Sequence, residues 1–361
     1  MFDLKSNDKN ARLGVLNTHN GKMYTPAFMP VATKGCVKSL SSDQVISTYT
    51  QGLICNAFLL YLKPGVEVIS DAGGIHNFMN WKRTLFTDSG GFQMLKKEFL
   101  ISVDKDGILF RSPFDNSSHL MTPQKCMEIQ GALGSDIAMV LDDVPRFNSS
   151  YDRALTSIRH TIEWAKLCKD NKSYNQQLFS IIQGGLFAKL REKCTEKLVD
   201  IGFDGYGIGG LSIGEPKKMM YKTIKDTTPL LPEESPRYLM GVGSPMELLE
   251  AISLGIDIFD SAFPTRNARH NTAYTKKGKL NLTRGKFRID FAPLEDRCKC
   301  LACKYYTRAY IHHLFKVHEQ LGMNLVTIHN IYFIQKILRE SRHAIKRDEF
   351  SDYKNSFKWY Y

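Results

Sequence analysis

The stretch TLFTDSGG, residues 84–91, is a short apolar run that closes on an aspartate, a serine and two glycines. Its length and its aromatic and β-branched side chains are typical of a buried strand, and Gly90-Gly91 is typical of the tight turn after one. Similar runs at residues 136–143 (DIAMVLDD) and 178–184 (LFSIIQG) also close on polar residues. Repeated strands with polar ends predict a parallel sheet whose functional side chains gather at one edge.

Eight such runs are spread along the chain, and we expect strands at residues 25–31, 52–58, 84–88, 136–143, 178–184, 205–211, 237–243 and 256–262. Segments with helical spacing separate them, and two have clear start signals at Ser41 and at Thr122-Pro123. Strands that alternate with helices form a parallel sheet, and eight such units close most naturally into a (β/α)8 barrel. The predicted fold class is therefore an α/β TIM barrel, with a doubly wound open sheet as the alternative.

Two segments interrupt this alternation. Residues 94–121 follow the third strand and contain the turn-forming sequence KDG, which predicts a hairpin. Residues 265–325 follow the eighth strand and hold a cluster of cysteines among many basic residues. We therefore expect a barrel core over residues 1–264, with 94–121 as an insertion, and an inserted basic zinc-binding subdomain with closing helices over residues 265–361.

The charge of the chain is positive and unevenly distributed. Lys and Arg outnumber Asp and Glu by 49 to 37 over 361 residues, and residues 261–310 alone contain twelve basic and three acidic side chains. Such a local excess predicts a polyanionic partner, and nucleic acid is the leading candidate.

The N-terminus and the apolar runs bear on location. MFDLKSNDKN is charged where a signal peptide is apolar, and the longest apolar run, residues 52–62, is too short to cross a bilayer. We therefore expect a cytoplasmic protein with no membrane partner. Scattered single cysteines favour reduced thiols over disulfides at Cys36, Cys55, Cys126, Cys168 and Cys194.

The remaining three cysteines, Cys298, Cys300 and Cys303, lie within six residues and predict a structural zinc site that needs a fourth ligand. His329 can supply it and leaves no cysteine unused. Alternatively, Cys300 and Cys303 pair with His313 and His318 as in a zinc finger, although the spacer is shorter than usual. Spacing alone favours His329 without excluding the finger.

Polar groups or glycines stand at the ends of six expected strands: Asn56, Asp88, Asp142 with Asp143, Gln183, Gly209 with Gly210, and Asp260. The carboxyl ends of barrel strands meet on one face, so these aspartates are expected to converge there. Carboxyl groups that share a cleft divide their roles, one ionised as a nucleophile and one protonated as an acid. The alternative is that each aspartate only caps the helix that follows.

Two local motifs admit other interpretations. Asp-Ser-Gly-Gly also surrounds the nucleophilic serine of trypsin-like proteases, but nothing else in the chain supports a triad, so we expect Asp88 to act and Ser89 to support it. GYGIGG, residues 205–210, fits a dinucleotide-binding pattern, but its glycines lie within the expected strand. We expect these glycines to let backbone amides approach a flat ligand.

Taken together, the motifs resemble one family. TPAFMPVAT, LFTDSGGFQM, GSDIAMVLDD, IIQGG, FDGYGIGGLSIGE, YLMGVGSP, FDSAFPTRNAR, the three clustered cysteines and TIHN have the order and spacing of bacterial tRNA-guanine transglycosylases, also called queuine tRNA-ribosyltransferases. The resemblance covers essentially the whole chain. It implies a zinc-bearing (β/α)8 barrel that exchanges guanine at the wobble position of GUN-anticodon tRNAs for a 7-deazaguanine base through a covalent tRNA intermediate.

The resemblance also implies roles for single residues. Asp260 matches the nucleophile and Asp88 the general acid and base. Further matches are the base-reading groups Asp142, Gln183, Gly210 and Leu211, the ring-sandwiching Phe92 and Met240, the RNA contacts Arg266 and Arg269, and the zinc ligands Cys298, Cys300, Cys303 and His329. Family members are homodimers, which is implied here as well.

The chain departs from the bacterial pattern at two places. Val144 stands where the bacterial family has cysteine, which favours queuine over 7-aminomethyl-7-deazaguanine as the incoming base. Residues 56–60 read Asn-Ala-Phe-Leu-Leu where the family has Asn-Thr-Tyr-His-Leu, and only Asn56 of the polar groups is kept. The rival hypothesis is a non-catalytic, RNA-binding paralogue, against which the presence of both Asp88 and Asp260 argues.

Overall fold

The computed structural model describes residues 1–173 and 175–357, and its centre is a parallel barrel. The eight strands are β4 Ala27–Pro30, β5 Gly52–Asn56, β6 Thr84–Asp88, β10 Ile137–Met139, β11 Gln177–Ile182, β12 Gly205–Ile208, β13 Arg237–Leu239 and β14 Ile258–Ser261. They pair in parallel in chain order, and β14 returns to β4. A parallel bridge between Val31 and Ile54 joins β4 to β5 and closes the ring. The predicted barrel is confirmed, and the open sheet is wrong.

The third strand ends at Asp88 as predicted, and the other seven are shorter than predicted at their carboxyl ends. The fourth ends at Met139 rather than residue 143, and the seventh at Leu239 rather than 243. The second ends at Asn56 because α2, Ala57–Leu62, begins directly after it and the Asn56 side chain caps that helix by accepting from the Leu59 amide at 2.8 Å. Beyond the fourth and seventh strands, the residues that were expected to extend them lie in loops at the carboxyl end of the barrel.

Helices follow the strands where the sequence predicted them. α1 Ser42–Ser47 starts with a capping box between Ser41 and Gln44, and α6 Pro123–Leu133 starts from a Thr122 cap with proline in its first turn. The other helices around the barrel are α3 Val66–Asp71, α4 Ile75–Phe78, α5 Gly91–Met94, α7 Tyr151–Asp170, α8 Ala188–Ile201, α9 Lys217–Thr227 followed by the 3-10 turn η1 Thr228–Leu230, and α10 Pro245–Ser253.

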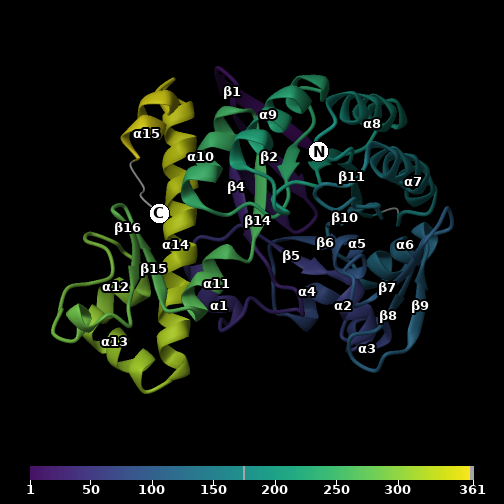
Figure 1. The fold of residues 1–361 in the computed structure, drawn as a ribbon. Coiled ribbons are helices and arrows are strands. Elements are labelled where there is room, and N and C mark those ends of the chain that lie inside the picture. The colour runs from purple at the N-terminus through teal and green to yellow at the C-terminus, as the bar shows by residue number, and fades with distance from the viewer. Residues whose placement is uncertain (174, 358–361) are drawn as a thin grey trace.

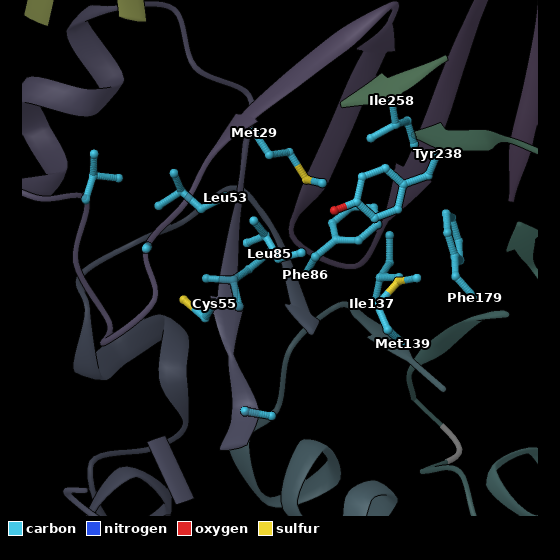
Figure 2. Close-up of a cluster of buried hydrophobic side chains, with 14 of the residues drawn as sticks. Met29, Leu53, Cys55, Leu85, Phe86, Ile137, Met139, Phe179, Tyr238 and Ile258 are labelled. Carbon is cyan, nitrogen blue, oxygen red and sulfur yellow. The ribbon is translucent and has the colours of Figure 1, made fainter. Parts of the chain in front are cut away.

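Large side chains fill the barrel interior, as Figure 2 shows for part of it. The Phe86 ring lies edge-on to both Phe179 and Tyr238, with ring centroids 5.4 and 5.9 Å apart. All three side chains are fully buried. The barrel is therefore a packed core, and chemistry is confined to its ends.

A three-stranded antiparallel sheet precedes the barrel and was not predicted from the sequence: β1 Phe2–Asp8, β2 Ala11–Thr18 and β3 Gly21–Thr25. It is tied to the amino ends of the barrel strands. The Asn20 amide nitrogens donate to Asp136, and Arg12 Nε lies 3.3 Å from a carboxylate oxygen of Asp257. The sheet covers the amino end of the barrel, which leaves the carboxyl end for function.

The insertion after β6 is a second small sheet. β7 Leu100–Val103 and β8 Ile108–Arg111 form the predicted hairpin around residues 104–107, and β9 Ser118–Met121 adds a third antiparallel strand.

The C-terminal segment winds around one long helix, α14 Gln320–Ile345 (Figure 1). Its elements are α11 Phe263–Arg269, β15 Thr272–Thr275, β16 Gly278–Asn281, the turn η2 Gly285–Phe287, α12 Leu301–Tyr305, α13 Arg308–Lys316 and α15 Phe350–Ser356. α14 packs against α12, α13 and β15 as well as against β4 and α10 of the barrel. Residues 358–361 of the expected subdomain lie outside the described residues, and the domain boundary at 264/265 stays a prediction. No helix in the described ranges is long and apolar enough to span a membrane.

Candidate functional site

Three carboxyl groups gather at the carboxyl end of the barrel. Asp88 is the last residue of β6, Asp260 is the next-to-last residue of β14, and Asp142 lies three residues beyond β10. The strands that carry them are neighbours in the ring or follow one another around it, and all end at the same end of the barrel. Burial raises the pKa of Asp142 and Asp260, and the charge of Asp88 adds to both shifts. The structure thus places all three groups at the carboxyl end of the barrel, while their roles stay predictions.

Asp88 is held by its own turn and by the neighbouring strand. Its Oδ1 accepts from the Gly90 amide at 3.1 Å, and its Oδ2 accepts from the Asn56 side-chain amide at 3.2 Å and from Gln93 at 3.5 Å. Burial raises the pKa of Asp88 above its usual value, although these hydrogen bonds oppose the shift. The group is therefore suited to carry a proton and to release it.

Asp260 is fixed by two short hydrogen bonds to one oxygen. Its Oδ1 accepts from the Tyr238 hydroxyl at 2.6 Å and from the Gly241 amide at 2.8 Å. Burial, aided by the charge of Asp88, raises the pKa of Asp260 to about 6. Its Oδ2 makes none of these bonds, which leaves one oxygen of a positioned carboxylate free to react.

Asp142 is joined to Gln183, which immediately follows β11. The Gln183 Nε2 donates to Asp142 Oδ2 at 2.6 Å, while Gln183 Oε1 is buried and has no hydrogen-bond partner among the described residues. Burial raises the pKa of Asp142 to about 7, with smaller contributions from the charges of Asp88 and Asp143. An unpaired buried acceptor beside a carboxyl group is a recognition element for a ligand with N–H donors.

Asp143 has a different role from its neighbour. It faces α7, where Arg153 donates to both of its oxygens and the His160 ring lies 3.0 Å away. Burial alone would raise its pKa, but the bonds from His160 and Arg153 outweigh burial and lower it. Asp143 is a structural anchor for α7 and does not join the cluster.

The described residues around Ser89 do not form the catalytic triad of a serine protease. The side chain is buried, and its Oγ accepts from the Gly91 amide at 3.4 Å. No histidine or aspartate in the described part of the chain bonds to it. This bond to the Gly91 amide is consistent with the expectation that Ser89 supports the turn that follows Asp88.

The glycine-rich stretch is not a phosphate-binding loop either. Gly205 and Gly207 lie in β12, and the next helix, α9, begins only at Lys217. Gly210 has a φ of +66°, and a Cβ there would lie 2.6 Å from Gln183 Oε1. Any other residue would be strained in this left-handed conformation and would displace the Gln183 side chain from its place beside Asp142.

The other predicted residues surround this end of the barrel. Phe92, on α5, is 48% exposed, Leu211 is buried, and Met240 and Val144 are half-buried. Arg266 and Arg269 lie on α11 just after β14. Neither arginine forms an ion pair with a carboxylate in the described ranges, so both remain available for an anionic ligand.

The second site lies in the C-terminal segment. Cys298, Cys300, Cys303 and His329 offer ligand atoms that all lie within 4.8 Å of one another. The cysteine sulfurs are 3.9, 3.4 and 3.3 Å from His329 Nδ1 in chain order. His313 and His318 are exposed and outside this group, so the zinc-finger alternative is wrong.

The donor set fits a structural zinc ion. Three thiolates and one imidazole are a standard tetrahedral zinc set that leaves no open position for a substrate. The other ring nitrogen of His329, Nε2, lies 2.6 Å from the Tyr274 carbonyl oxygen, which fixes the ring with Nδ1 toward the sulfurs. The four residues thus form a preorganised metal site.

Sequence reasoning missed two residues that complete these sites. Tyr238 holds Asp260, and the Tyr274 carbonyl orients His329. A signal existed for Tyr238, because a tyrosine inside an apolar strand needs a hydrogen-bond partner for its hydroxyl. No comparable signal existed for a backbone carbonyl.

A (β/α)8 barrel with converging, protonatable carboxyl groups at its carboxyl end and a separate Cys3His metal centre defines a barrel enzyme with a structural zinc site. The family model for queuine tRNA-ribosyltransferase matches residues 7–361. The chain belongs to this family of tRNA-guanine transglycosylases.

Individual relatives agree over nearly their whole length. A queuine tRNA-ribosyltransferase of Pelotomaculum thermopropionicum is 47% identical over 98% of this chain and 96% of its own. Those of Halothermothrix orenii and Thermodesulfovibrio yellowstonii are 46% and 44% identical, over 96% and 99% of this chain and 93% and 94% of theirs. The resemblance inferred from the motifs is confirmed.

Proposed function

We propose that the protein exchanges guanine at the wobble position of GUN-anticodon tRNAs for a 7-deazaguanine base, with Asp260 as nucleophile and Asp88 as general acid and base. The observation that carries this proposal is the group of three carboxyls at one end of the barrel, with Asp142 buried and Asp88 and Asp260 partly buried. Asp260 presents a free oxygen, Asp88 has a raised pKa and Asp142 adjoins an unpaired amide oxygen. No redox or nucleotide cofactor is required for such an exchange.

In the first half of the reaction, the Asp260 carboxylate bonds to the anomeric carbon of the ribose as the bond from that carbon to guanine breaks. Asp88 donates its proton to the departing base, so the leaving group is neutral. The tRNA is then held as an ester of Asp260. Tyr238 and the Gly241 amide stabilise the carboxylate before attack and fix which oxygen reacts.

In the second half, the incoming base attacks the same carbon and gives its proton to Asp88, while the ester bond breaks and Asp260 regains its carboxylate. Two displacements retain the configuration at the sugar. Because Asp88 first donates and then accepts, its raised pKa serves both halves.

Recognition of the base falls to the adjoining residues. Asp142 and Gln183 Oε1 accept from the amino and ring N–H groups of a guanine-like base, and the backbone of Gly210 and Leu211 meets the opposite edge. Phe92 and Met240 cover the two ring faces. The apolar Val144 offers no hydrogen bond to the substituent at position 7, which favours queuine over 7-aminomethyl-7-deazaguanine.

The tRNA binds at the outside of the barrel. Its wobble base flips out of the stack to enter the site. Arg266 and Arg269 contact the neighbouring nucleotides, and the basic segment after α11 neutralises phosphates. The Cys3His centre carries zinc in a structural role. We place the protein in the cytoplasm as a homodimer. The exposed Ile289, Phe291 and Tyr305, in the segment that also carries the three cysteine ligands, support a contact between copies there.

The proposal is tested by incorporating radiolabelled guanine into unmodified tRNA with a GUN anticodon and chasing with queuine or with 7-aminomethyl-7-deazaguanine. We expect incorporation, displaced best by queuine. Displacement only by the aminomethyl base would support the exchange activity but would contradict the proposed role of Val144 in selecting queuine. No incorporation by folded, zinc-loaded protein would favour the non-catalytic RNA-binding paralogue.

A further inference from the structure

A buried arginine lies behind the proposed base pocket, on the outer side of the barrel. Arg191, on α8, is 2% exposed, yet its guanidinium makes no ion pair in the described part of the chain. Instead it donates to three backbone carbonyls: Nε to Gly185 at 2.7 Å, Nη2 to Gly209 at 2.8 Å and Nη1 to Ile182 at 3.4 Å. Burial lowers its pKa to about 10, so the group remains charged at neutral pH.

These carbonyls belong to the loops that carry the base-reading groups. Ile182 precedes Gln183 at the end of β11, and Gly209 precedes Gly210 at the end of β12. The Gly209 amide also donates to the Ile182 carbonyl at 3.0 Å, so Arg191 completes a network between two neighbouring strand ends.

The peptide between Gly209 and Gly210 is flanked by two glycines, and Gly210 is in the left-handed region. Such a peptide rotates easily, because no Cβ opposes the alternative conformations. The peptide group is planar and trans, so a carbonyl held on one side directs the following N–H to the other. With the Gly209 carbonyl on Arg191, the Gly210 N–H points away from Arg191.

We propose that Arg191 is a positioning residue that locks the Gly209–Gly210 peptide with its N–H directed at the bound base. The inference rests on the proposed function and deepens it, since it assigns the orientation of one recognition group to a residue that does not touch the substrate. A purely structural arginine would affect the stability of the fold without a selective effect on the base.

Arg191→Ala tests this positioning role. Loss of one directed hydrogen bond to the base raises its KM by about tenfold or more. The KM for tRNA stays within about twofold, because Arg266 and Arg269 are untouched. Added guanidinium ion should restore the base KM. The side chain lines a surface cavity of about 390 Å³ beside α8 and α9, through which the ion can enter.

The matched control is Arg342→Ala. Arg342, on α14, also donates to backbone carbonyls, those of Pro26 at 2.6 Å and Tyr24 at 3.3 Å, and forms no ion pair among the described residues. Burial lowers its pKa to about 10 as well. Its carbonyls lie at the opposite end of the barrel, so the variant loses stability but keeps the base KM, and guanidinium has no effect on that KM.

An Arg191→Ala variant whose base KM is unchanged, or rises equally with the tRNA KM, overturns the role. If this variant does not fold, Arg191→Lys is measured instead. Lysine keeps the charge but lacks the planar set of donors, so an unchanged base KM for the folded lysine variant also overturns it.

Failure of the proposed exchange activity can be distinguished from failure of the positioning role of Arg191. If the wild type exchanges no guanine, the function fails. Equilibrium binding of guanine to wild type and to the Arg191 variants then tests the peptide orientation alone: at least about tenfold weaker binding to the variants supports it, and equal or absent binding overturns it.

Discussion

At the scale of single residues, the charged and hydrogen-bonding groups around each carboxyl group determine whether its pKa is raised or lowered. Asp142 and Asp143 are adjacent and both buried, yet the pKa of Asp142 is raised to about 7 while that of Asp143 is lowered. Asp143 has a guanidinium and an imidazole against it, whereas Asp142 has only a neutral amide. Successive residues of an extended chain point to opposite sides, so one faces the pocket and the other faces α7. The sequence identified both as strand-end aspartates but could not assign the sides.

The raised pKa of Asp260 predicts a cost to stability. Its pKa rises from 3.8 to about 6 on folding, so the folded state holds the proton more tightly and ionisation destabilises it. This destabilisation is absent below about pH 4, grows towards pH 6 and is complete above it. Asp260→Asn should therefore increase the free energy of unfolding by roughly 1–3 kcal/mol at pH 8 and leave it unchanged at pH 4. Denaturant titrations at both pH values measure this, and a variant less stable than wild type at pH 8 contradicts it.

The lowered pKa of Asp143 predicts the opposite dependence. Its contribution to stability is present above the unfolded pKa and is lost as the pH falls through the folded pKa. Asp143→Asn should lower the free energy of unfolding by about 2–4 kcal/mol at pH 7, and the difference should shrink on acidification. Asp142→Asn is the control, since it should weaken base binding without this loss. Equal stability of the Asp143 variant and wild type at pH 7 would show that the anchor on α7 is dispensable.

At the scale of elements, much of the barrel was predictable because its signals are local. Apolar runs marked all eight strands, and Ser41 and Thr122 marked two helix starts that the structure confirms. The sheet β1–β3 was missed although Asn20-Gly21 is a hairpin signal and β1 alternates between more and less exposed residues, because its strands are rich in polar residues. The strand ends were placed too late, because apolar character continues into the pocket loops, as at Val140 and Leu141, which are buried beyond the end of β10.

The fourth metal ligand shows the limit of spacing arguments. Both His329 and the pair His313 and His318 satisfied the local pattern, and only the packing of α14 brings His329 to the cysteines. Similarly, the role of Tyr238 depends on the pairing of β13 with β14, which sets its hydroxyl against Asp260. Both assignments depend on tertiary contacts that a single sequence does not specify.

At the scale of the whole molecule, α14 connects the Cys3His site to the barrel. It carries His329 and packs against α12 and α13 (Figure 1). Six residues further along, Gln335 donates to the Phe28 carbonyl of β4 at 2.9 Å. Buried residues from Met29 of the barrel to Cys300 and Ile328 belong to one continuous hydrophobic cluster. The C-terminal segment therefore contributes to the stability of the barrel.

This continuity predicts the effect of metal removal. His329→Ala should abolish tight zinc binding, measured as zinc per chain by elemental analysis. It should also lower the midpoint temperature at which the whole protein unfolds in a single transition. Strong chelators should do the same to the wild type. His313→Ala is the matched control, because that histidine is exposed and should leave both quantities unchanged. Full zinc content in the His329 variant would remove this histidine from the ligand set.

The central claim is that Asp260 bonds covalently to the tRNA, and the most direct measurement is a denaturing gel of enzyme mixed with unmodified GUN-anticodon tRNA, followed by mass spectrometry of the attached peptide. The matched control is Asp257→Asn, at the start of the same strand, because burial also raises the pKa of Asp257 to about 6. We predict an adduct on the peptide containing Asp260 in the wild type and in the Asp257 variant, and none in Asp260→Asn. An adduct that persists in folded Asp260→Asn protein, or that maps to another residue, would contradict the account.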